Sequence, residues 1–191
     1  MKIENSFEVT ASPEAAWDLL MDVPRVIPCM PGAELVETVD DSNWKARMRV
    51  KLGPISLTFL TDVKRDEVDE AARRVKLAAN AREERGRGAA SATIESSLAP
   101  AEAEGYTRVN TVTELTLTGP VAQYGRGLVQ DVSSQLLRNF ADCLESQLAS
   151  SSNGEAPAPA PVQKPVSGLS LGLSALGRSI ARFFRGIVRR G

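Results

Sequence analysis

The chain has 191 residues with ordinary globular proportions of 42% apolar and 25% charged residues, which excludes a wholly disordered chain. It contains no histidine, which excludes Ser-His-Asp and Cys-His catalysis and histidine-ligated metal sites. The net charge of −1 conceals an asymmetry, because residues 150–191 carry a net charge of +5 and the preceding residues one of −6, so we expect two different partners.

The first residues predict a strand followed by short helices. Residues 2–10 alternate polar and apolar side chains with the period of a strand. They contain no continuous apolar run of the secretory type, so we expect the protein to stay in the cytoplasm. Ser12 is a suitable N-cap and Pro13 a suitable first residue for a short helix. Repeated prolines allow only a turn or two of helix within residues 22–30.

Residues 33–118 predict six further strands. The clearest spans residues 44–52, where apolar residues alternate with a cationic row. That row is typical of a solvated strand face, with an acidic docking partner as the alternative; it consists of Lys45, Arg47, Arg49 and Lys51. Residues 66–70 and 82–88 are interpreted as turns, the first acidic and the second without the helix start of a phosphate loop. The other strands are expected at 33–39, 55–63, 73–83, 88–98 and 106–118, in an antiparallel meander.

A change of apolar period at Gly119-Pro120 predicts a closing helix of some 28 residues that reaches Leu148. Strand, short helices, six strands and long helix together indicate an α+β fold, with a curved antiparallel sheet of about seven strands around the long C-terminal helix. Such a sheet often encloses space that the helix does not fill, and small inner residues favour an apolar ligand cavity. Ordinary core packing is the alternative for each candidate pocket residue, namely Met48, Val50, Leu57, Phe59, Tyr124, Leu128, Val132 and Leu136.

The two cysteines, Cys29 and Cys143, are too few for an iron–sulfur or cysteine-rich zinc site, and we expect no metal. As two lone thiols they do not suggest a secreted disulfide framework. We expect both as small core or pocket residues and not as nucleophiles. No acid/base pair is evident anywhere in the body, so no catalytic residue is predicted.

The last part of the chain divides into a linker and an amphipathic segment. Residues 150–166 are rich in Pro and Ala, which predicts an extended, semi-rigid linker that reaches at most about 50 Å. Residues 167–191 predict a helix with one apolar and one cationic face, and the uncharged run of 12 residues from Val166 to Gly177 is too short to span a bilayer. Glycines within it make it a poor helix alone, so we expect it to fold on a surface; they are Gly168, Gly172, Gly177 and Gly186.

An anionic membrane is the expected surface, with a groove on a partner protein as the main alternative. Nucleic acid is not expected, because the apolar stripe is continuous and no stacking aromatics alternate with the basic residues. The predicted membrane-binding residues are Leu169, Leu173, Leu176, Ile180, Phe183, Phe184 and Ile187 on the apolar face, and Arg178, Arg182, Arg185, Arg189 and Arg190 on or beside the cationic face.

Four segments of residues 1–148 resemble the carbon monoxide dehydrogenase G-subunit family, of the START-like, helix-grip superfamily. They are Phe7-x-Val9-x-Ala11-Ser12-Pro13-Glu14-x-x-Trp17-x-x-Leu20-x-Asp22, Ile27-Pro28-Cys29-Met30-Pro31-Gly32-Ala33, Lys51-Leu52-Gly53-Pro54-Ile55 and Gly119-Pro120-Val121-Ala122-Gln123-Tyr124-Gly125. The resemblance implies a helix-grip fold in an accessory protein that brings a soluble, molybdenum-containing carbon monoxide dehydrogenase to the cytoplasmic face of the membrane. It carries over no catalytic residue.

These observations lead to one leading hypothesis and two alternatives. In the leading hypothesis, residues 1–149 form a START-like domain that holds a hydrophobic ligand, residues 150–166 form the linker, and residues 167–191 bind the membrane. The expected ligand is a non-covalently bound respiratory quinone, menaquinone or a similar one, inferred from the cavity, the membrane and the expected partner. The alternatives are a membrane-anchoring factor for a molybdenum hydroxylase with no ligand, and a START-like lipid-binding or cyclase-type protein.

Overall fold

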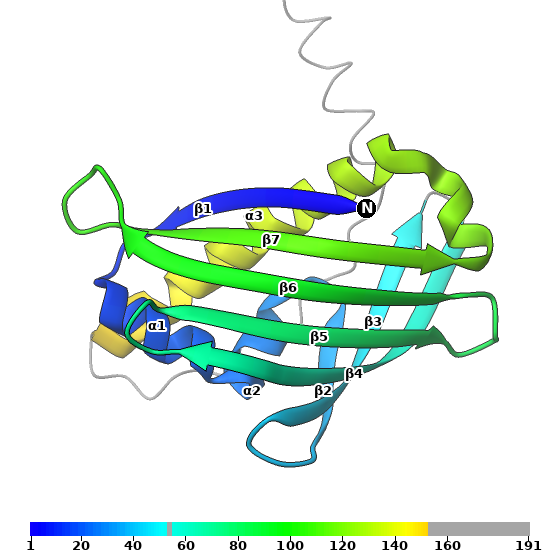
Figure 1. Cartoon of the computed structure of the whole chain (residues 1–191), viewed down its shortest axis with the longest axis horizontal. Coiled ribbons are helices and arrows are strands. Elements are labelled where there is room, and N and C mark those ends of the chain that lie inside the picture. Colours follow the sequence, from blue (N-terminus) through cyan, green and yellow to red (C-terminus); the bar gives the residue numbers. More distant parts are fainter. Residues whose placement is uncertain (53–54, 153–191) are drawn as a thin grey trace, which may run out of the picture.

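A seven-stranded antiparallel sheet forms most of the described structure, which is a computed structural model and covers residues 1–52 and 55–152. The strands lie in the order β1-β7-β6-β5-β4-β3-β2, so that β2 to β7 form a meander and β1 joins it beside β7. Figure 1 shows this sheet curving around the long helix α3, which confirms the predicted α+β helix-grip architecture. The strands are β1 (Lys2–Val9), β2 (Ala33–Thr38), β3 (Asn43–Leu52), β4 (Ile55–Asp69), β5 (Arg74–Glu83), β6 (Ala89–Pro100) and β7 (Thr107–Thr118).

The helical elements begin where the sequence places their caps. Ser12 accepts a hydrogen bond from the backbone N–H of Ala15 at 3.2 Å and thereby caps α1. Asp22 caps α2 in the same way, through the backbone N–H of Arg25 at 3.3 Å. The elements are α1 (Pro13–Met21), α2 (Val23–Val26), η1 (Ile27–Cys29), η2 (Gly119–Tyr124) and α3 (Gly125–Ser152).

Two predicted boundaries are wrong by several residues. The closing helix has the expected 28 residues but starts at Gly125, because Gly119–Tyr124 forms a 3₁₀ turn. Gly119 has φ +76° and lies against the hairpin turn between β5 and β6, where a Cβ would approach the carbonyl oxygen of Arg87 to 2.7 Å. The acidic run after residue 65 belongs to β4, because a bulge there lets the strand continue and places Glu67 opposite Lys76.

The main core lies at one end of the molecule, where α1, α2 and η1 meet α3 and the sheet. Val9 and Val109 of the sheet and Leu144 of α3 are almost fully buried there. Phe7 and Phe140 pack edge to face with ring centroids 6.0 Å apart. These contacts fix the C-terminal half of α3 on the sheet.

A disulfide joins Cys29 of η1 to Cys143 of α3, so the expectation of two unpaired thiols is wrong. Both residues are buried, as predicted, and their Cα atoms are 5.4 Å apart although 114 positions separate them in the chain. Gln147, one turn further along α3, donates hydrogen bonds to the carbonyl oxygen of Arg25 at 3.1 Å and to the sulfur of Cys29 at 3.3 Å. The disulfide and Gln147 together hold α2 and η1 against the long helix.

Candidate ligand-binding cavity

A cavity of about 350 Å³ lies between the concave face of the sheet and α3, next to the core. It occupies the end of the molecule where β3, β5 and β7 finish and α3 begins (Figure 1). All its lining residues except Leu57 and Phe59 keep partial solvent exposure, so solvent reaches the cavity. The lining consists of Met30, Met48, Val50, Leu57, Phe59, Thr61, Ala79, Ala81, Ala90, Ala92, Ile94, Thr113, Leu115, Leu117, Val129, Val132, Ser133 and Leu136.

Small side chains on β5 and β6 explain why this space is empty. Ala81 pairs with Ala90, and Ala79 with Ala92, in the middle of the sheet and on its concave face. A methyl group reaches much less far from the sheet than a leucine or phenylalanine side chain, so these positions leave space between the sheet and α3. The four alanines therefore open a hollow in a layer that would otherwise be filled.

Most of the lining is apolar. Within the described part, the polar side chains that line the cavity are those of Thr61, Thr113 and Ser133, which carry hydroxyl groups. The lining contains no carboxylate, ammonium, guanidinium or phenol group among the described side chains. An apolar molecule would bind here by burial of its surface, and the hydroxyls can donate or accept a few hydrogen bonds that orient it. The described lining offers no titratable group for acid/base catalysis.

Six of the eight residues predicted for the pocket line the cavity, namely Met48, Val50, Leu57, Phe59, Val132 and Leu136. The side chains of Tyr124 and Leu128 lie outside the described part of the structure. Most lining residues of β5, β6 and β7, such as Ala79 and Leu117, are absent from the predicted set, although the same period-two alternation places them on the concave face. That these residues bind a ligand stays a prediction.

Among the described residues, Glu83 is the one buried carboxylate at this end of the sheet. Its hydrogen bonds stabilise the turn between β5 and β6. Its Oε1 accepts a hydrogen bond from the guanidinium of Arg87 at 2.8 Å, and its Oε2 accepts from the backbone N–H groups of Arg85 and Arg87. The Arg87 guanidinium and these N–H groups lower the pKa of Glu83 to about 2. An ionised carboxylate with both oxygens occupied holds the turn and does not serve as a general acid.

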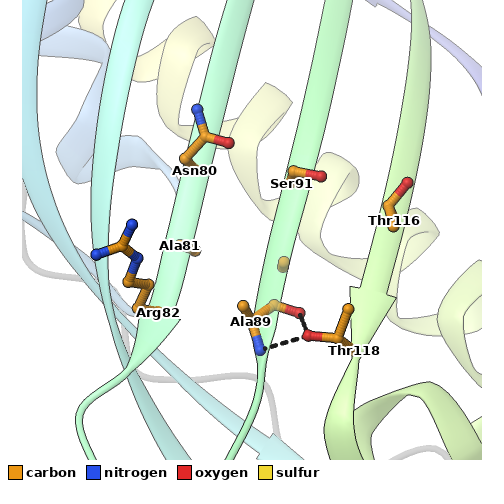
Figure 2. Close-up of a pocket in the computed structure, with 8 residues that line it drawn as sticks. Asn80, Ala81, Arg82, Ala89, Ser91, Thr116 and Thr118 are labelled. Atoms are coloured by element: carbon orange, nitrogen blue, oxygen red, sulfur yellow. Dashed lines mark hydrogen bonds between the residues drawn. The ribbon is translucent and has the colours of Figure 1, made fainter. Parts of the chain in front are cut away.

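A second, smaller hollow of about 190 Å³ lies on the convex face of the same strands (Figure 2). The side chains of Asn80, Ser91 and Thr116 point outward there from β5, β6 and β7, and Arg82 extends beside them near the end of β5. Ala81 and Ala90 line both hollows, so the sheet between them is little more than backbone. This outer hollow is smaller than the cavity under α3, and polar side chains border it.

The cationic row of β3 is largely neutralised by neighbouring glutamates. Lys45 pairs with Glu37 at 2.7 Å, and both Arg47 and Arg49 lie 3.6 Å from Glu34. Arg47 also pairs with Glu84 at 3.3 Å. The row is therefore a solvated strand face whose cations have local partners, which agrees with the solvated face expected from the sequence. Its fourth member, Lys51, makes no ion pair within the described residues.

The predicted membrane-binding residues all lie outside the described residues, so the structure does not test them. No helix in residues 1–52 and 55–152 has the length and apolar content that crossing a bilayer requires. The same part of the chain contains no cluster of three or more potential metal ligands.

The sequence profile of the carbon monoxide dehydrogenase G-subunit (CoxG) family matches residues 6–149. Because this match covers most of the chain, the protein belongs to that family, which implies association with carbon monoxide dehydrogenase. The match agrees with the resemblance carried by the motifs around Ser12, Cys29 and Gly119. No curated protein sequence matches the chain.

Solved structures with low sequence identity share the fold. A conserved protein from Geobacillus kaustophilus has a TM-score of 0.70 at 21% identity and covers 79% of this chain and 97% of its own. The ZhuI aromatase/cyclase from Streptomyces sp. R1128 has a TM-score of 0.57 at 14% identity, with 82% and 99% covered. A norcoclaurine synthase from Thalictrum flavum has a TM-score of 0.56 at 16% identity, with 80% and 96% covered. At these identities the likeness establishes the START-like fold and not an activity.

Proposed function

We propose that this member of the CoxG family is an accessory protein with two tasks. It recruits a molybdenum-containing carbon monoxide dehydrogenase, or a related molybdenum hydroxylase, to the inner face of the cell membrane. It also holds a hydrophobic ligand, a respiratory quinone such as menaquinone, in the cavity under α3. In this way it links a soluble enzyme to the electron transport chain.

The apolar cavity is the observation that carries the ligand part of the proposal. Its volume of about 350 Å³ is at the lower end of the range of about 300–1,000 Å³ found for small-molecule sites. A quinone ring with the first part of its chain suits such a space, and the rest of a long chain would extend from the solvent-accessible side. Quinone carbonyl oxygens accept hydrogen bonds, and the hydroxyls of Thr61, Thr113 and Ser133 can donate them.

The lining argues against the cyclase-type alternative. Acid/base catalysis needs a titratable group within hydrogen-bond reach of the substrate. The described lining residues carry hydroxyl groups only, and the nearby Glu83 is ionised and fully hydrogen-bonded. Binding without turnover therefore agrees better with the site than an enzymatic reaction does.

The sequence of the last 25 residues supports the membrane part of the proposal. Seven large apolar side chains share one face of the expected helix, and five arginines lie opposite or beside them. Each arginine near an anionic leaflet contributes about 1 kcal/mol, and partial burial of the apolar face adds a comparable amount. We therefore expect binding to require both a lipid surface and negative charge.

Mass spectrometry of an organic extract of the purified full-length protein tests the ligand part. We expect about one quinone per chain after loading from menaquinone-containing vesicles, and at least tenfold less in Ala92→Phe, whose ring fills the cavity. Ala78→Phe, on the convex face of the adjacent strand, is the matched control and should keep the ligand. Thermal unfolding verifies that both variants fold. Absence of quinone from loaded wild-type protein would contradict this part of the proposal.

Flotation with vesicles tests the membrane part. Wild-type protein should float with vesicles rich in phosphatidylglycerol and less so in high salt, because salt screens the arginines. Changing Arg178, Arg182, Arg185 and Arg189 to Glu should abolish flotation. Equal flotation of this variant, or no flotation of the wild type with any lipid, rejects membrane binding by residues 167–191.

A further inference from the structure

The end of the molecule that contains the cavity carries an excess of free positive charge. Lys51 at the end of β3, Arg82 at the end of β5 and Arg85 in the following turn are exposed, and none makes an ion pair with a described residue; we call these three residues the basic rim. The two glutamates of this region do not cancel them, because Glu83 is paired with Arg87 and Glu84 with Arg47. Asp131 in the first turns of α3 is exposed without an ion pair to a described residue and offsets one of the three cations, so the excess that remains is positive.

The opposite end of the same sheet is acidic. Its turns and α1 present four exposed carboxylates that make no ion pair within the described part of the chain, namely Asp18, Glu70, Glu102 and Glu104. Arg74 at the start of β5 is also exposed there without an ion pair to a described residue, so this end keeps an excess of negative charge and not a purely acidic surface. The two ends lie at opposite ends of the strands (Figure 1). Near an anionic surface the rim is attracted and the acidic end repelled, and both forces turn the cavity end toward that surface.

The basic rim adjoins the cavity directly. The lining residue Val50 immediately precedes Lys51, and the lining residue Ala81 immediately precedes Arg82. Successive strand residues point to opposite faces, so each pair places an apolar side chain in the cavity and a cation on the outer surface. A flat anionic surface that contacts the rim would therefore lie beside the apolar lining.

We infer that the basic rim is a docking surface for an anionic lipid bilayer, which sets the cavity end of the body on the membrane. The inference rests on the proposed function, since it names the face through which the body meets the membrane that residues 167–191 bind. It adds a contact that the amphipathic segment alone does not provide: a tethered body without the rim would have no attractive contact of its own with the bilayer at the cavity end.

The length of the linker fits this orientation. The 28 residues of α3 span about 42 Å at 1.5 Å per residue, and the helix ends at the acidic end of the body. Residues 153–168 separate it from Leu169, the first residue of the apolar face, and at about 3.1 Å per residue they reach at most about 50 Å. The chain is thus just long enough for the amphipathic segment and the rim to contact one bilayer together.

Fluorescent labels at the two ends of the body test the orientation without requiring a bound ligand. Ala122 in η2 and Ala103 in the turn between β6 and β7 are exposed alanines at the cavity end and the acidic end. Each is changed to Cys in the full chain and labelled, which is selective because the native cysteines form a disulfide. On phosphatidylglycerol vesicles we expect the label at residue 122 to be shielded from acrylamide, a neutral quencher, and the label at residue 103 to stay accessible.

Charge reversal of the rim should remove this shielding. Each basic residue near an anionic surface changes the binding constant by about fivefold, so the triple change Lys51→Glu, Arg82→Glu and Arg85→Glu should lower the ratio of docked to undocked bodies by at least about 100-fold. The matched control, Lys64→Glu, Arg74→Glu and Lys76→Glu, makes the same change in net charge and should leave the label at residue 122 shielded. Thermal unfolding verifies the fold of each variant.

Shortening the linker gives an independent test. Deletion of residues 155–164 leaves six residues, about 19 Å, which cannot span the length of α3. We expect this variant to float with vesicles as the wild type does but to lose the shielding at residue 122. Replacement of the same ten residues by a Pro-Ala repeat of equal length is the control and should retain both properties.

The outcomes separate this inference from the proposed function. Loss of flotation in the wild type is a failure of the proposed membrane recruitment. Normal flotation with equal quenching of both labels, or with shielding that survives reversal of the rim, overturns the docking inference alone. If the rim variant instead loses binding to the purified dehydrogenase while neither label is ever shielded by lipid, the rim belongs to the protein partner and the inference is wrong.

Discussion

At the end of the sheet beside α1, β5 and β6 contribute Val75 and Leu98 to the core, whereas at the other end the same two strands contribute alanines to the cavity. The helix above them differs in the same way, since Leu144 is 2% exposed and Leu136 lies at the hollow with partial exposure. The alternation of inward and outward residues is equal at both ends. Side-chain volume, at a few inward positions, distinguishes the filled core from the cavity.

The disulfide lies at the core end and should have the largest effect there. Changing Cys29 and Cys143 together to Ala removes a crosslink that closes a loop of more than 100 residues, and we expect a loss of about 4 kcal/mol in the free energy of unfolding. Urea denaturation measures it. Reductant should destabilise the wild type and leave the double variant unchanged. Two titratable thiols in native wild-type protein would contradict the pairing.

Truncation of α3 should distinguish the two ends directly. Leu144→Ala removes a buried side chain from a filled layer, and we expect a loss of about 3 kcal/mol. Leu136→Ala only enlarges an existing hollow, so its cost should be less than half as large. Urea denaturation of both variants checks this difference. Equal losses would mean that the cavity end is packed as tightly as the core.

Enlargement of alanines should have opposite signs at the two ends. Ala92→Leu places methyl groups in empty space and should raise the free energy of unfolding by about 1 kcal/mol when no ligand is present. Ala16→Leu, at a core position that is 3% exposed, should lower it by about 1–3 kcal/mol because the layer is already full. The comparison fails if both variants are destabilised alike.

The buried carboxylate at the cavity end predicts the smallest effect, a change in pH dependence. The pKa of Glu83 is about 2 in the folded protein and lower than in the unfolded chain, so its contribution to stability is fully present above about pH 4.5 and is lost as the pH falls toward 2. Stability of the wild type should therefore decrease more steeply over this interval than that of Glu83→Gln. Urea midpoints at several pH values measure the two slopes, and parallel slopes would exclude the effect.

The sequence predicted features that depend on near neighbours. Period-two alternation placed Met48, Val50 and Phe59 on the concave face, where they line the cavity. The Ser12-Pro13 pair located the start of α1. The sequence did not reveal that β4 extends beyond residue 65, because a bulge breaks the period there. It also did not reveal that glutamates of β2 and of the turn after β5 neutralise the cationic row of β3.

By itself, the sequence determined the strands, the capped helices, the order of the elements and the family, because these depend on periodicity and on residues a few positions apart. Tertiary structure alone decided that Cys29 meets Cys143, that the alanines of β5 and β6 face one another, and that Lys51, Arg82 and Arg85 lie at the cavity end. These features join residues from distant segments, and their positions follow from the register and curvature of the sheet, which local patterns do not encode.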